Sequence, residues 1–270
     1  MKHIKNIAKR GVEGIIYDND ISLLFEGWKG RKEKIIILGP HDDDPLIGAG
    51  MLIYALRQEG IDIRIAIMTD GSKGYCRAGQ KNEIISIRKR ETESAYETLG
   101  IGKSNIKWFE LPDSDTEQHA WKWETVRGAE DGLIAQMIKY FREINATRFI
   151  LPNENDFHID HKVTFEAGLY CAIQASEPIV PDFGKNSRRD TILRYGVWSP
   201  FKGMPSHSAR MSEEALMKKV KAVREYKSQM HVKAIVRALE GRGPFEFFQE
   251  YIVAPYPSAD YEMHFWGRQK

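Results

Sequence analysis

One short stretch, His41-Asp42-Asp43-Asp44, carries an imidazole and three carboxylates, and Pro45 follows it directly. Carboxylates this close together repel one another and lose hydration unless a positive charge lies among them. A divalent cation is the simplest source of that charge, because a bound metal ion is often the largest local charge in a site. The stretch therefore predicts one half of a metal site.

A second group of histidines and carboxylates, which contains His158, Asp160 and His161, occurs later in the chain. Zinc in catalytic sites takes three protein ligands and leaves one coordination position open. His41, Asp44 and His161 would form such a set of two imidazoles and one carboxylate. The separation of three residues between His41 and Asp44 would let a tight turn direct both side chains toward one point.

Two further side chains would then remain for proton transfer. Asp43, between two of the ligands, would act as a general base and take a proton from water that the metal has acidified. If His161 binds the metal, His158 would stabilise the oxyanion and the leaving group. These residues by themselves predict metal-assisted hydrolysis.

The elements expected around the two groups place them at equivalent positions. Apolar runs predict buried strands over residues 33–38 and 148–151, and each group follows the end of its strand. In open parallel sheets, ligands bind outside the carboxyl ends of the strands, so the two loops would face one another. Further strands are expected over residues 61–68, 106–111 and 191–198, and helices over 46–58, 84–99, 126–141, 163–175 and 213–228.

The alternation of strands and helices predicts an α/β fold, with a Rossmann-like, mostly parallel sheet and helices on both faces. We expect a single domain over residues 33–270 that includes a C-terminal extension. Residues 1–32 are interpreted as an irregular or helical lead-in that packs on the domain. The aromatic-rich segment 245–266 is interpreted as packing.

Composition narrows the class of protein. Forty Lys and Arg against 38 Asp and Glu leave a net charge of +2, which argues against a nucleic-acid partner. No apolar run is long enough to span a bilayer, so we expect no membrane span and a cytoplasmic location. Cys76 and Cys171 lack metal-ligand spacing and are interpreted as small hydrophobic residues. A homo-oligomer is compatible with the sequence, which does not determine the oligomeric state.

The two groups resemble the signatures of a known family. His41 to Pro45, followed by Gly48-Ala49-Gly50, resembles the His-Pro-Asp-Asp-Glu motif of the LmbE-like (PIG-L) zinc de-N-acetylases, and His158 to His161 resembles their His-Pro-Asp-His motif. Weaker similarities in the same order span about residues 33 to 250. The resemblance implies a zinc-dependent hydrolase, with Fe²⁺ as an alternative metal. Its substrate would be a small N-acetylated amino sugar of the N-acetylglucosaminide type that loses its acetyl group.

The resemblance also implies roles for individual residues. It places the metal ligands at His41, Asp44 and His161. It places the general base at Asp43 and the stabilising histidine at His158. Asp160 matches a catalytic-site acid that would orient an imidazole, and Asp70 and Arg88 match positions that would contact the substrate. Trp121 and Trp123 would either stack on a sugar or seal a pocket.

Three positions depart from the family pattern. Asp42 and Ile159 replace the usual prolines, and Pro45 replaces the usual Glu, which removes a carboxylate near the site while Asp42 adds one. Alternatives to the deacetylase are a metal-dependent phosphoesterase, a non-haem Fe(II) oxygenase and a non-catalytic sugar-binding relic. Two histidines favour zinc over Mg²⁺, and the retained Asp43 and His158 argue against a relic. The sugar, its aglycone and the pathway are not determined by the sequence.

Overall fold

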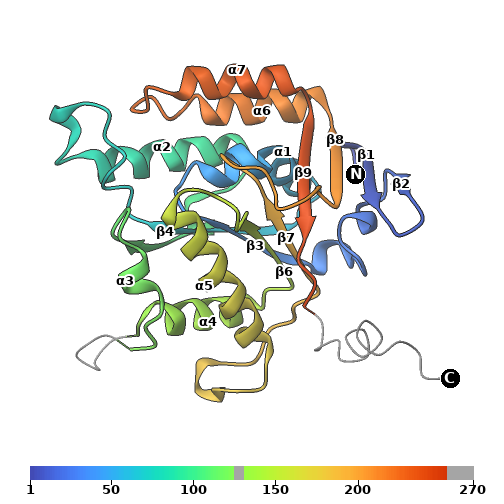
Figure 1. Ribbon diagram of the computed structural model, residues 1–270, viewed down its shortest axis with the longest axis horizontal. Helices are drawn as coiled ribbons and strands as arrows, with labels where there is room; N and C mark the ends of the chain where they lie inside the picture. The colour runs from blue at the N-terminus through green and yellow to red at the C-terminus, as the bar shows by residue number, and fades with distance from the viewer. Residues whose placement is uncertain (125–130, 254–270) are drawn as a thin grey trace, which may run out of the picture.

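The computed structural model describes residues 1–124 and 131–253, in which nine strands form one sheet with helices on both faces (Figure 1). The strand order is β2-β1-β8-β9-β7-β6-β3-β4-β5. The strands are β1 Ile4–Arg10, β2 Ile15–Asp18, β3 Lys34–Gly39, β4 Asp62–Thr69, β5 Ile106–Leu111, β6 Arg148–Pro152, β7 Thr191–Tyr195, β8 His207–Met211 and β9 Phe245–Glu250. The α-helices are α1 Asp44–Gln58, α2 Ile84–Thr98, α3 Glu117–Ala120, α4 Leu133–Ile144, α5 Ile159–Ser176, α6 Glu213–Val223 and α7 Val232–Arg242.

Five neighbouring strands, β7, β6, β3, β4 and β5, are parallel to one another. The chain runs outward from β3 through β4 to β5 and then returns to β6 on the other side of β3. The strand order therefore reverses between β3 and β6, which is where open α/β sheets bind their ligands. The predicted α/β class with a mostly parallel central sheet is confirmed.

Two hydrophobic cores cover the two faces of the sheet. In β3, Ile35 and Ile37 belong to one core, whereas Ile36 and Leu38 belong to the other. Strands that are buried on both faces need such a continuous apolar run, because successive side chains point to opposite faces. Helices α1, α2, α6 and α7 lie on one face, and α3, α4 and α5 lie on the other (Figure 1).

The N-terminal segment differs from its prediction. Residues 1–32 contain the hairpin β1–β2, and β1 pairs antiparallel with β8, so the expectation of an irregular or helical lead-in is wrong. The register between β1 and β8 shifts between Ile4 and Asn6. The strand was not predicted for two reasons. Such an irregularity interrupts the alternation of apolar side chains, and the partner strand β8 lies far along the sequence. The domain boundary at residue 33 stays a prediction.

The expected helix 213–228 is shorter in the structure, where α6 ends at Val223 and a turn leads into α7. The backbone N–H and the hydroxyl of Ser228 both donate to the carboxylate of Glu91 in α2, each at 2.7 Å. This long-range contact holds the turn, and helical periodicity does not reveal it. The residues beyond it form β9 and α7, and α7 completes the pocket described below.

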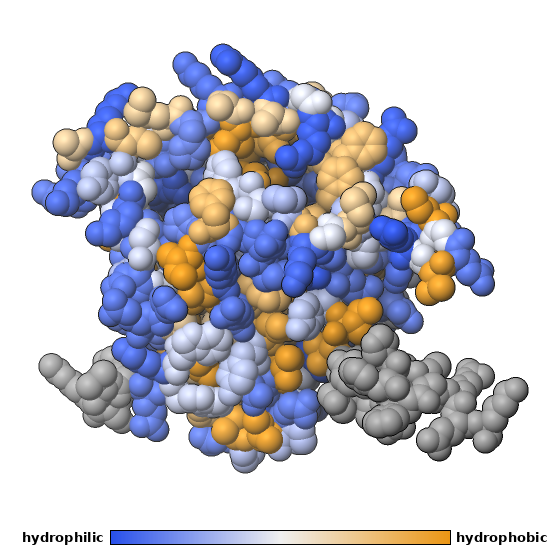
Figure 2. Space-filling model, in the orientation of Figure 1, coloured by the Kyte–Doolittle hydropathy of each residue, from blue (hydrophilic) through white to orange (hydrophobic). Residues whose placement is uncertain are grey.

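Some predictions lie partly outside the described residues. The expected helix 126–141 begins with residues 126–130, which are not described, and α4 begins at Leu133. The aromatic segment 245–266 is described only as far as residue 253. Within the described ranges, no helix is both long and apolar enough to cross a membrane. The face shown in Figure 2 is mainly hydrophilic, with separate hydrophobic patches. Cytoplasmic localisation stays a prediction.

Candidate metal centre

Both predicted groups lie at the start of a helix. Asp44 is the first residue of α1, and Pro45 lies in its first turn. Backbone N–H groups in the first turn have no partner within the helix, so proline, which lacks this group, is tolerated there. His158 is the N-cap of α5, and its side chain accepts a hydrogen bond from the N–H of Asp160. Because β3 and β6 are adjacent and parallel, their carboxyl ends bring the two helix starts to the same place. His41, Asp43, Asp44, His158 and His161 therefore come together as the sequence predicts.

The three predicted ligands share one point of approach. Oδ2 of Asp44 lies 3.1 Å from Nδ1 of His41 and 3.1 Å from Nε2 of His161. Ligand atoms that surround one zinc ion at about 2.0–2.2 Å would themselves lie roughly 3 Å apart or slightly more. The spacing of this set therefore fits a single divalent ion.

His161 provides a test of this fit, because its side chain is fully buried. Its Nε2 has no hydrogen-bond partner within residues 1–124 and 131–253, although Asp44 lies close to it. Buried polar atoms are almost always bonded, so such an atom needs an explanation, and a metal ion supplies one. Burial lowers the pKa of His161, but the carboxylates of Asp44 and Asp156 together outweigh it and raise this pKa to about 9. The site thus favours a positive charge, and a metal ion would replace the proton.

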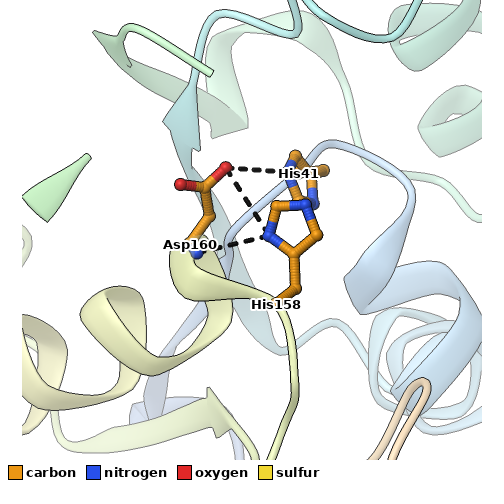
Figure 3. Close-up of side chains that lie close together, drawn as sticks. All are labelled: His41, His158 and Asp160. Carbon is orange, nitrogen blue, oxygen red and sulfur yellow. Dashed lines mark hydrogen bonds and ion pairs between the residues drawn. The ribbon is translucent and has the colours of Figure 1, made fainter. Parts of the chain in front are cut away.

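The outer nitrogen of His41 faces two other carboxylates. Its Nε2 lies 3.1 Å from Oδ2 of Asp160 (Figure 3). The same nitrogen lies 3.3 Å from Oδ1 of Asp113. Asp160 also accepts hydrogen bonds from the N–H of Ser114 and the hydroxyl of Thr116. Burial lowers the pKa of His41, but the surrounding carboxylates raise it well above its usual value. Carboxylates in this position fix the orientation of a metal-binding imidazole, so Asp160 occupies the position that the resemblance implies.

Two carboxylates that support the ligands were not among the predicted site residues. Asp113 follows β5 and contacts His41, and Oδ2 of Asp156 lies 3.3 Å from Nδ1 of His161. Both are Asp residues in loops at the carboxyl ends of parallel strands. That position is the only signal in the sequence that could have identified them.

His158 presents its second ring nitrogen to the cavity. Its Nδ1 accepts the N–H of Asp160 at 3.3 Å, so a neutral ring carries its proton on Nε2. The ring centroid lies 4.8 Å from that of His41 (Figure 3). Burial and the nearby charge of His41 lower the pKa of His158. The predicted role of His158 as a hydrogen-bond donor beside the metal stays a prediction.

Asp43 is nearly buried and faces one cation. Its Oδ1 lies 3.2 Å from Nη2 of Arg88. Burial raises the pKa of Asp43, and Arg88 opposes that shift without cancelling it. A raised pKa suits a general base, because the most effective catalytic pKa lies near the working pH.

Arg88 is itself held by Asp42, one of the residues that depart from the family pattern. The guanidinium of Arg88 binds both carboxylate oxygens of Asp42, with Nε 3.0 Å from Oδ2. The hydroxyl of Thr92 donates to the same carboxylate, and the ring of Tyr226 lies under the guanidinium at 4.9 Å. Asp42 therefore fixes the cation that faces Asp43. Arg88 also lines the pocket, so its predicted contact with substrate stays a prediction.

A cavity of about 650 Å³ opens above the metal ligands. Its far wall is formed by Phe157, Trp198, His231 and Ile235, of which the last two belong to the segment around α7. Trp198 is 45% exposed and lies in the loop after β7. The cavity is large enough for a small-molecule ligand and combines a polar floor with an apolar wall.

Other predicted substrate contacts lie elsewhere. The carboxylate of Asp70 accepts the backbone N–H groups of Ser72 and Asp113, and Asp70 does not line this cavity. Its direct contact with substrate stays a prediction. Trp121 and Trp123 pack edge-on against the ring of Tyr170, away from the cavity. Both predicted roles, stacking on a sugar and sealing a pocket, would need these tryptophans at the site, and neither side chain lines this cavity.

The fold and this site define an α/β protein with a candidate metal centre where the strand order reverses. The PIG-L family model, described as GlcNAc-PI de-N-acetylase, matches residues 36–172, which is just over half of the chain. The chain therefore belongs to the PIG-L family. The matched range contains every predicted metal ligand.

Individual relatives are more distant. The diacetylchitobiose deacetylase of Thermococcus kodakarensis is 35% identical over 84 residues, which is 30% of this chain and only 32% of that relative. The solved N,N'-diacetylchitobiose deacetylase of Pyrococcus horikoshii shares 20% identity and a TM-score of 0.66, covering 84% of this chain and 88% of that one. GalB, a 4-carboxy-2-hydroxymuconate hydratase of Pseudomonas putida, shares 14% identity and a TM-score of 0.64, covering 83% and 98%. At these identities the structural matches show the fold alone, and the fold hosts more than one chemistry.

Proposed function

We propose that this chain is a metal-dependent hydrolase that removes the acetyl group from an N-acetylated amino sugar. The observation that carries the proposal is the shared approach of His41, Asp44 and His161 to one point, with Asp43 and His158 lining the same cavity. Membership of the PIG-L family and the similarity to a diacetylchitobiose deacetylase support the substrate class.

His41, Asp44 and His161 would hold the metal ion. When bound, such an ion polarises a carbonyl group and lowers the pKa of a coordinated water. Two imidazoles and one carboxylate favour zinc, although Fe²⁺ accepts the same set. Magnesium prefers oxygen ligands, so a magnesium-dependent phosphoesterase is less well supported.

The remaining residues divide the proton transfers. Asp43, with its raised pKa, would accept the proton of the attacking water and later return it to the leaving amine. The Nε2–H of His158 would donate to the amide oxygen as negative charge develops there, which stabilises the transition state. Asp160 and Asp113 would keep the His41 ring in its orientation throughout.

Replacing Asp43 with Asn tests the assignment of the base. We expect the variant to retain its metal and to release amine from N-acetylglucosaminides roughly 10²–10⁴-fold more slowly, because only proton transfer is lost. Replacing His161 with Ala should instead lower metal affinity, since one of three ligands is removed. Metal content by elemental analysis and amine release by a fluorogenic assay measure the two effects separately.

Asp115→Asn is the matched control, because Asp115 is an exposed loop carboxylate outside the cavity. It should leave both metal content and turnover unchanged. Turnover of Asp43→Asn at the wild-type rate would contradict the role of Asp43. Activity that survives complete removal of metal by a chelator would contradict the proposed function as a whole.

A further inference from the structure

A second cavity, of about 740 Å³, lies beside the metal pocket between the loop that contains Arg77 and helix α7. Its lining is strongly basic. Five cationic side chains and a single carboxylate line it, whereas the whole chain carries a net charge of only +2. These side chains are Arg77, Arg224, Lys227, Lys233, Arg237 and Glu240.

Most of this positive charge is not neutralised by the protein. Arg224 pairs with Glu240 at 3.0 Å, and Lys227 pairs with Glu225 at 3.0 Å. Within the part of the chain that the structure describes, Arg77, Lys233 and Arg237 have no carboxylate within 4.0 Å. Cations held together without counterions repel one another, so an anionic ligand would stabilise this arrangement.

The start of α7 adds to the same field. Val232 and Lys233, the first two residues of this eleven-residue helix, line the cavity. The first turn of α7 contains no acidic residue, and the side chain of its N-cap, His231, makes no capping bond in the described part of the chain. The partial positive charge at the helix start is therefore directed toward the cavity and favours an anion.

The basic cavity adjoins the metal pocket. Gln229 lines both cavities, and its Nε2 donates to the carbonyl of Gly74 at 2.7 Å. The loop that carries Gly74 continues to Arg77, so its first part lines the metal pocket and its last part lines the basic cavity. Helix α7 follows the same border, with Ile235 facing the metal pocket and Val236 facing the basic cavity.

We infer that the basic cavity binds an oxyacid group, a phosphate or a carboxylate, and that this group belongs to the aglycone of the substrate. The inference rests on the proposed function, because it places the acetylated sugar at the metal ligands and the remainder of the substrate beyond Gln229. Guanidinium groups match both phosphate and carboxylate oxygens through paired hydrogen bonds, and two of the three unneutralised cations are arginines. The preferred substrate would then be an acidic amino-sugar conjugate.

The test removes the three unneutralised cations together, as Arg77→Gln, Lys233→Gln and Arg237→Gln. All three side chains belong to exposed residues, so the variant should fold. The matched control is Lys221→Gln, an exposed lysine of α6 that does not line the cavity. Calorimetric titration with inorganic phosphate measures anion binding without any need for turnover. Kinetics on neutral N,N'-diacetylchitobiose and on an N-acetylglucosaminide with a carboxylate-bearing aglycone measure selectivity.

We expect wild-type enzyme at low ionic strength to show a KM about tenfold lower or more for the acidic substrate, with similar kcat, because charged hydrogen bonds strengthen binding. The triple variant should lose this difference and lose phosphate binding, whereas Lys221→Gln should keep both. High salt should reduce the wild-type difference.

The outcomes separate the two proposals. Equal KM values together with phosphate binding that the triple variant retains would overturn the inference. Equal KM values with phosphate binding that the triple variant loses would overturn the assignment to the aglycone and leave a free anion as the ligand. If neither substrate is deacetylated but the triple variant still loses phosphate binding, the proposed function fails while the anion site stands.

Discussion

The parallel half of the sheet and the antiparallel half contribute different things to the same pocket. The strands β3 to β7 and their loops supply every predicted metal ligand, and the family model covers most of this half. The antiparallel strands β8 and β9 enclose α6 and α7 in sequence, and α7 contributes to the far wall of the metal pocket and to one side of the basic cavity. The predicted ligands therefore come from the parallel half, whereas the wall that would select a substrate combines Phe157 and Trp198 of that half with helix α7 of the other half.

The two cavities also have opposite electrostatic character. The metal pocket gathers carboxylates around two imidazoles, which draws a cation, whereas the neighbouring cavity gathers cations. In the metal pocket, the guanidinium of Arg88 contacts Asp43, and its ion pair with Asp42 holds it in this position. We therefore expect changes around the predicted metal ligands to alter turnover, and changes in the pocket wall or in the basic cavity to alter substrate binding.

After the proposed base Asp43 itself, the largest effect is expected at the Asp42–Arg88 pair. Asp42→Asn should lower kcat roughly 10–100-fold with little change in KM, because Arg88 would no longer be fixed beside Asp43. Arg88→Gln and the double variant complete a double-mutant cycle. Both single changes would remove the same effect of Arg88 on Asp43. The loss of activation free energy in the double variant should therefore be much smaller than the sum of the two single losses.

Steady-state kinetics and thermal melts on the three variants provide the check. The melts are needed because removing one partner of a buried ion pair costs about 3–5 kcal/mol of stability. Additive effects on kcat in variants that remain folded would show that Asp42 does not act through Arg88.

A smaller effect is expected at Trp198 in the wall of the metal pocket. Trp198→Ala should raise KM roughly threefold to tenfold and leave kcat nearly unchanged, since an aromatic contact contributes about 0.5–1.5 kcal/mol. Trp121→Ala is a close control, because Trp121 is 47% exposed against 45% for Trp198 but packs on Tyr170 outside the pocket. Equal KM changes in both variants would show that the pocket wall at Trp198 does not select the substrate.

The smallest effect concerns stability rather than activity. His207 in β8 is buried, and burial, with a smaller contribution from the charge of Lys9, lowers its pKa to about 4. An unfolded histidine has a pKa near 6.5, so between about pH 6.5 and 4 the unfolded chain binds a proton that the folded chain does not. Stability should fall across this window as pH decreases, by roughly 3 kcal/mol at most from this residue.

His207→Gln should flatten that part of the pH dependence, which urea unfolding at several pH values would measure. His119→Gln, in the short helix α3 with a side chain that is 39% exposed, should leave it unchanged. An identical pH dependence in wild type and His207→Gln would show that His207 stays protonated or is not buried in solution.

Much of the parallel half could be predicted from local pattern. The run Ile35 to Leu38 is apolar at every position, as a strand buried on both faces requires, and the His and Asp groups at strand ends identified the loops that meet. In contrast, β1 was missed because its register shift breaks the alternation and its partner β8 lies at residues 207–211. The start of α7 was missed because the turn before it is held by a contact with another helix, in which Ser228 donates two hydrogen bonds to Glu91 of α2.

The site shows the same division. The sequence by itself determined which residues could bind a metal and which could move a proton, because those properties follow from side-chain type and from spacing at a strand end. Only the tertiary structure decided which groups support them: Asp156 at His161, Asp113 at His41, and Asp42 at Arg88.

The walls of the pocket were also decided by the tertiary structure. Tyr226 reaches the carbonyl of Asp42 across 184 positions of sequence, and Trp198 rather than Trp121 faces the cavity. Such contacts depend on how distant segments pack, and no local period or spacing encodes them. The stretch from His41 to Pro45 therefore predicts a metal centre from the sequence, while the folded chain determines what can bind beside it.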